Sequence, residues 1–245
     1  MGDWLWRRPE ALDPETCAGS QGVGVQELTG LRVSRPPCRP ASWRTFASTP
    51  LTVLSHPFVR LRDADGRNVY VARYTSCKDA EHAEEWLLQD ARLREAVGRC
   101  SAPATLTLML SESPCHYSSN RASWSCTEAL LKFEREALRP KGVQLDVAAG
   151  IPYRAHWDER LTPPEEWARV REKVASARQG LGLLSGQLRA MSASDWAFVG
   201  TCCSDQIQAG LDAGSGGGVP ADVLAARRRA DAFTAEFFAA ALTEG

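Results

Sequence analysis

The strongest constraint on the fold is the alternation of strand-like and helix-like segments from residue 51 onward. Two segments rich in β-branched and aromatic residues come first, separated by Asp65-Gly66, a pair that favours the tight turn of a β-hairpin. Helices and strands then alternate to the end of the chain. Strands joined through helices pair in parallel, because the helix returns the chain to the same end of the sheet. The sequence therefore predicts an α/β fold whose sheet is covered on both faces and is parallel in its later part.

Several helix starts carry local signals. Asp79 is the expected N-cap of the helix that follows the hairpin. Ser125, three residues before Glu128, fits the capping box, in which the two residues bond reciprocally to the backbone. Thr162 and Glu165 fit the same pattern. The expected strands cover 51–61, 68–74, 105–110, 143–149 and 187–192, and the expected helices cover 80–97, 126–138, a segment from 163 onward, 194–199 and 220–242.

Length and charge limit the class of protein. We expect a single domain over 1–245, with its core at about 45–212, a glycine-rich flexible break at 213–219 and a C-terminal helix over 220–245. The formal net charge of -1 argues against a basic coat, so nucleic acid would have to bind a local patch. No signal-peptide pattern and no apolar run of ~20 residues is present. A cytoplasmic or nuclear protein without a membrane partner is therefore expected.

Three short motifs carry candidate chemistry. His82 and Glu84 stand two apart at the start of one helix, Cys115 follows a proline after a strand, and Cys126 opens the next helix. A zinc deaminase needs three protein ligands, a coordination position left for water, and a carboxylate that moves protons without binding the metal. Helix N-termini favour thiolate over thiol, which suits such a site. The pattern favours a metal site built from these residues.

These motifs resemble those of the AID/APOBEC cytidine deaminases, within the wider cytidine-deaminase-like superfamily. The resemblance rests on HAE at 82–84, SESPC at 111–115 and the helix after it, and it extends over about 51–199. It implies a three-layer fold with a five-stranded mixed sheet and about six flanking helices. It also implies Zn²⁺ held by His82, Cys115 and Cys126, with Glu84 as the proton shuttle. The implied reaction is hydrolysis of cytosine to uracil in single-stranded DNA or RNA.

One departure from this family lies between the two cysteines. Ten residues separate Cys115 from Cys126, where the family usually has two to four. The insert could bulge as a loop while both thiols reach the metal, or His116 could replace one ligand. Alternatively the site is lost and the fold is a zinc-stabilised binding module without activity. A free cytidine or deoxycytidine deaminase also fits these residues, as does a secreted protein whose eight cysteines form disulfides.

Candidate substrate-binding residues lie in two loops. Tyr153, His156 and Trp157 follow the fourth expected strand, where the resemblance implies a substrate loop. Trp43 and Arg44 precede the first strand, where it implies another. Aromatic and basic side chains of this kind can stack on bases and neutralise phosphates. Ordinary loop packing explains the first group equally well, and a solvated arginine-rich linker is the alternative for the second. The partner is either single-stranded nucleic acid or a nucleoside, and the oligomeric state is left open.

Overall fold

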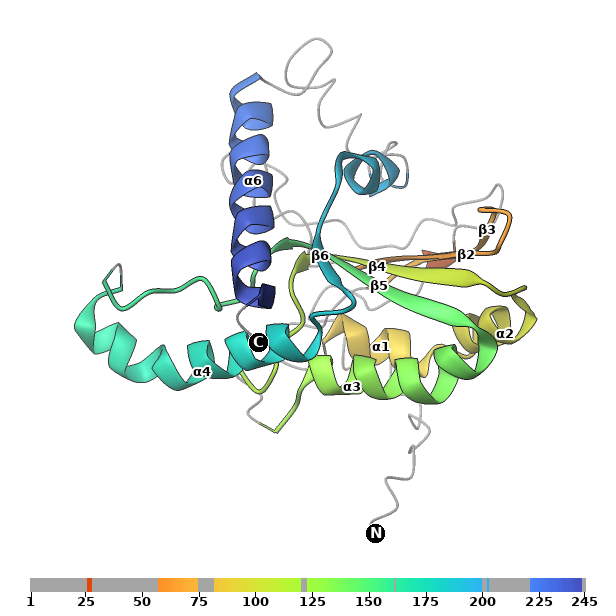
Figure 1. Cartoon of the computed structure of the whole chain (residues 1–245), viewed down its shortest axis with the longest axis horizontal. Helices are drawn as coiled ribbons and strands as arrows, with labels where there is room; N and C mark the ends of the chain where they lie inside the picture. Colours follow the sequence, from red (N-terminus) through yellow and green to blue (C-terminus); the bar gives the residue numbers. More distant parts are fainter. Residues whose placement is uncertain are drawn as a thin grey trace, which may run out of the picture.

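The computed structural model describes residues 26–27, 57–74, 82–119, 123–160, 162–199, 202 and 221–243. They form the expected α/β fold, with a mixed sheet in the order β1-β3-β2-β4-β5-β6 (Figure 1). Strands β1, β3, β2 and β4 pair antiparallel, whereas β4-β5 and β5-β6 pair in parallel. The five strands expected from the sequence are present, and β1 (Gln26–Glu27) adds two residues at one edge. The remaining strands are β2 (Phe58–Arg62), β3 (Asn68–Arg73), β4 (Ala104–Glu112), β5 (Val143–Ile151) and β6 (Leu188–Ala190).

The first helical segment differs from its prediction. The structure has two helices, α1 (Ala83–Gln89) and α2 (Ala91–Arg99), in place of one helix over 80–97. Asp90 is extended between them, and its carboxylate caps α2 by accepting from the backbone N–H of Arg92 at 2.8 Å. The same carboxylate accepts the hydroxyls of Tyr70 and Tyr74. The N-cap of α1 is His82, and Asp79 lies outside the described residues.

The later helices follow the sequence more closely. Ser125 caps α3 (Cys126–Phe133) by accepting from the backbone N–H of Glu128 at 3.1 Å, as the local pattern predicts. The helical path continues through η2 (Glu134–Leu138) and η3 (Arg139–Lys141) and ends at Gly142, in the left-handed region. The second expected capping box is wrong, because Pro163 is the N-cap of α4 (Pro164–Leu183) and no side chain caps that helix. Residues 193–199 are helical, and α6 spans Ala221–Thr243.

The β-hairpin is confirmed where the structure describes it. Gly66 has a φ of 77°, a left-handed conformation that the tight turn requires. The carboxylate of Asp63 accepts the backbone N–H groups of Asp65 and Arg67 and closes the turn. The part of the first expected strand before residue 57, and the glycine-rich break at 213–219, lie outside the described residues.

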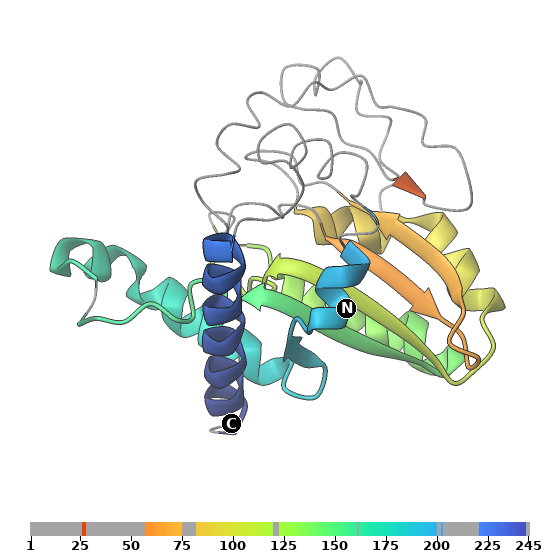
Figure 2. The same ribbon diagram turned by 90° about the horizontal axis from the view of Figure 1, so that it is seen from above.

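Different segments of the chain cover the two faces of the sheet. Helices α1 to α4 lie on one face, and residues 193–199 lie on the other (Figures 1 and 2). The first face holds the main apolar core, which includes Leu106, Leu108 and Val147. A smaller cluster on the second face joins Phe58 and Met109 to residues after β6. None of the described helices has the length and apolar character needed to cross a membrane.

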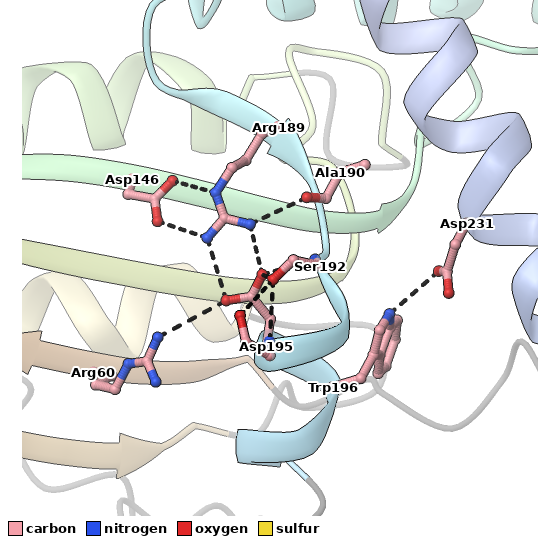
Figure 3. A network of polar contacts seen from close by, with 9 residues as sticks. Arg60, Asp146, Arg189, Ala190, Ser192, Asp195, Trp196 and Asp231 are labelled. Atoms are coloured by element: carbon pink, nitrogen blue, oxygen red, sulfur yellow. Dashed lines mark hydrogen bonds and ion pairs between the residues drawn. The ribbon is translucent and has the colours of Figure 1, made fainter.

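Charged side chains hold residues 193–199 to the second face of the sheet (Figure 3). Arg189 on β6 donates two hydrogen bonds to Asp146 on β5 and two to Asp195. Asp195 also accepts from the backbone N–H and the hydroxyl of Ser192, at 2.8 and 2.6 Å. Although burial opposes ionisation of Asp195, the hydrogen bonds from Arg189 and Ser192 outweigh it and lower its pKa to about 2 from 3.8. The ionised carboxylate therefore stabilises the folded state.

We predict that Asp195→Asn lowers the free energy of unfolding by about 2 kcal/mol at neutral pH. Because the pKa is depressed in the folded state, this contribution is complete above pH 3.8 and disappears as the pH falls towards 2. Denaturant unfolding of both proteins across this range measures it. Asp158→Asn is the control, since Asp158 pairs with Arg160 at the surface and little change is expected there. A gap between wild type and Asp195→Asn that does not narrow in acid would contradict the assignment.

Candidate metal centre

Three elements bring their ends together at the candidate centre. His82 is the N-cap of α1, Cys126 is the first residue of α3, and Cys115 follows β4. Among the described residues, these three form the group that could hold a metal ion, with their ligand atoms all within 4.8 Å of one another. Nδ1 of His82 lies 3.1 Å from Sγ of Cys126 and 3.5 Å from Sγ of Cys115. Tetrahedral zinc with bonds of about 2.0 and 2.3 Å separates nitrogen from sulfur by about 3.5 Å. The spacing fits one shared ion.

Backbone hydrogen bonds fix the positions of the ligands. The carboxylate of Glu85 accepts from the backbone N–H of His82 at 2.8 Å, which holds the start of α1. The N–H of Thr127 donates to the carbonyl of Cys115 at 3.0 Å, which ties the chain after β4 to the first turn of α3. Both cysteines are buried and His82 is half-buried. The ligand group is therefore supported by the fold.

The group favours a negatively charged sulfur. Hydrogen bonds from Cys126 and His82 lower the pKa of the Cys115 thiol well below its usual range. The same hydrogen bond to Cys115 raises the pKa of His82. A metal ion needs deprotonated sulfur and a neutral imidazole, so it would displace the protons that these groups share. The donor set of one nitrogen and two sulfurs is of the kind that binds zinc.

Glu84 lies beside the ligands without being one of them. Its side chain is half-buried in the first turn of α1, and it is not part of the ligand group. Burial raises the pKa of its carboxyl to about 6. The charges of Cys115 and His82 also act on this pKa, the first raising it and the second lowering it. A carboxyl that titrates near neutrality next to a metal can take up and return protons.

The ten-residue insert does not prevent the two cysteines from meeting. Both thiols belong to the ligand group, so the interpretation of the insert as a loop agrees with the structure. His116 is not in this group, and its Nδ1 lies 3.0 Å from Oγ of Ser125. The hypothesis that His116 replaces a ligand is therefore wrong. Cys100, Cys115, Cys126 and Cys202 form no disulfide, so a disulfide framework that includes them is wrong as well.

The expected substrate residues that the structure describes lie in the loop after β5. Tyr153 is half-buried after β5, its N–H donates to the hydroxyl of Ser113, and burial raises the pKa of its phenol. His156 is engaged within its loop, since Nδ1 lies 2.6 Å from the carbonyl of Pro152 and the ring packs edge-on against Phe233 of α6.

Trp157 adjoins an open pocket, which it lines with His156 and Pro163. A role of Trp157 in substrate binding stays a prediction. Trp43 and Arg44, the candidates in the other loop, lie outside the described residues.

Sequence reasoning missed Arg154. Its guanidinium lies 5.1 Å from the ring centroid of Tyr153 and 5.9 Å from that of Trp157. It also donates to the carbonyl of Ser118 in the insert, which links the two loops. The signal in the sequence is a basic residue between two aromatic ones, and in the structure Arg154 has a positive φ of 53°.

Comparison with known proteins does not assign the chain to a family. No protein-family model matches it. A search among curated proteins found no significant relative. The fold and the His-Cys-Cys group therefore carry the functional argument by themselves.

We predict that the reduced protein binds one divalent metal ion per chain and that Cys126→Ser weakens this binding by about tenfold or more, because a buried sulfur ligand is lost. Competition with a chromophoric chelator measures the affinity. Cys202→Ser is the matched control, because Cys202 lies outside the ligand group. Equal affinity of the two variants would place the metal elsewhere.

Proposed function

We propose that this protein is a zinc-dependent hydrolase that deaminates cytosine to uracil in single-stranded nucleic acid. The observation that carries the proposal is the gathering of His82, Cys115 and Cys126 within 4.8 Å, beside a half-buried carboxyl that is not a ligand. Three protein ligands leave a position for water, as catalytic zinc sites do. The resemblance of the motifs to the AID/APOBEC deaminases supports the same reaction.

The proposed chemistry requires proton transfers, which we assign to Glu84. Zinc, when bound, lowers the pKa of its water towards neutrality. Glu84 would accept the proton that this water loses and deliver protons to N3 of the cytosine ring and to the departing amine. Water and cytosine thus give uracil and ammonia. A carboxyl with a pKa of about 6 can both accept and return a proton near neutral pH.

The loop after β5 supports a polynucleotide substrate. Tyr153 and Trp157 offer aromatic faces, and Arg154 between them offers a positive charge. Bases stack on aromatic rings and phosphates pair with arginine, so this combination suits a single strand better than a lone nucleoside. The patch is local, which is compatible with the formal net charge of -1.

The first test is deamination of an oligonucleotide that contains one cytosine. We expect Glu84→Gln to lower kcat at least about 100-fold, because the proton carrier is lost, while one metal ion per chain is retained. Glu95→Gln, an exposed carboxylate on α2, is the control and should leave the rate unchanged. Equal product from wild type and Glu84→Gln would remove the assignment, and a loaded wild type without product would favour a binding module.

The second test separates a polynucleotide from a free nucleoside. We predict that Arg154→Ala raises the KM for the oligonucleotide about tenfold and leaves the turnover of free cytidine unchanged, because only the oligonucleotide offers a phosphate chain. Arg160→Ala, in the same loop but paired with Asp158 at the surface, serves as the control. Activity on cytidine alone would overturn the polynucleotide assignment.

A further inference from the structure

The ten-residue insert is folded back on itself directly before Cys126. His116 and Ser125, at its two ends, form an isolated antiparallel bridge, and Nδ1 of His116 lies 3.0 Å from Oγ of Ser125. The N–H of His116 is also 3.3 Å from the hydroxyl of Ser118. These contacts close the loop at its base.

Helix α4 packs against the base of this loop. A Cβ at Gly180 would lie 2.4 Å from Cβ of His116, so only glycine allows the helix and the insert to approach so closely. The hydroxyl of Ser176, one turn earlier on α4, donates to the carbonyl of His116. The end of the insert that follows Cys115 is therefore held against α4, and the bridge from His116 to Ser125 ties the other end to it.

Trp124, the last aromatic residue of the insert, reaches the candidate metal centre. Its indole Nε1 lies 3.2 Å from Sγ of Cys126. Trp124 also lines a pocket of about 350 Å³ between α1 and α3, together with Leu88 and Phe133. An indole N–H is a donor only, so Trp124 cannot bind a metal ion but can donate to a ligand of one.

We propose that Trp124 is a positioning residue that donates its indole N–H to the metal-bound thiolate of Cys126 and withdraws electron density from it. This inference rests on the metal centre of the proposed function. A hydrogen bond to a ligating sulfur fixes its orientation and weakens its donation to the metal, which makes the metal a stronger Lewis acid. The insert that separates the two cysteines thereby supplies an outer partner for one of them.

The full chain loaded with Co²⁺ tests the inference by absorption spectroscopy. In Trp124→Phe the sulfur is more electron-rich, so we expect its charge-transfer band to Co²⁺ to move to longer wavelength. Trp86→Phe is the matched control. Trp86 lies on α1, and its Nε1 is buried without a hydrogen-bond partner. The charge-transfer band of this variant should stay at the wild-type wavelength. Identical spectra of Trp124→Phe and wild type would overturn the inference alone. Absence of cobalt bands from wild type would overturn the metal centre and, with it, the inference.

A measurement on the unaltered protein keeps the inference testable if Trp124→Phe fails to fold. With ¹¹³Cd²⁺ in the site, scalar coupling passes through an N–H···S hydrogen bond to the metal. We expect the indole proton of one of the eight tryptophans to show coupling to cadmium. Cadmium bound by the cysteines with no coupled indole would contradict the hydrogen bond.

Discussion

The parallel pairing of β4 with β5 is the constraint on which the candidate centre depends. Since the two strands run in the same direction, the chain that leaves β4 must return along α3 before β5 can begin. Helix α3 therefore starts at the end of the sheet where β4 stops. Cys115, after β4, and Cys126, at the start of α3, are neighbours for this reason, whatever the length of the segment between them.

This constraint explains why a long insert is compatible with a compact ligand group. The hydrogen bond from Thr127 to the carbonyl of Cys115 joins the two sides of the insert at its base, so the length of the insert does not separate the two thiols. His82 completes the group because α1 lies against α3 on the same face of the sheet (Figure 1). The starts of two helices thus meet at one point, and their partial positive charges favour the thiolate and the carboxylate there.

The parts of this arrangement that the sequence predicts are local ones. The cap at Ser125 and the turn at Gly66 each depend on a few neighbouring residues. The break at Asp90 depends on two tyrosines, one on β3 and one directly after it, which no local pattern reveals.

The closure of the insert was equally hidden, because it depends on Gly180, far along the chain in α4. The residue types of the candidate site were visible in the sequence. The contacts that Glu85, Trp124 and Arg154 make around the site depend on the fold, so the sequence did not reveal them.

The second face of the sheet contributes to the site through α6. Asp195 and Arg189 hold residues 193–199 against β5 and β6, and Trp196 in this segment donates to Asp231 of α6 (Figure 3). Thr234, about one turn further along α6, donates to the carbonyl of Gly150 at the end of β5.

The loop that carries Tyr153, Arg154 and Trp157 begins directly after this contact, and His156 within it packs against Phe233. The loop is therefore anchored on one side by the strand and on the other by α6. If the proposed function holds, a fixed ring position would favour stacking of a base, and the charged network on the far face would then support the same site as the ligand group.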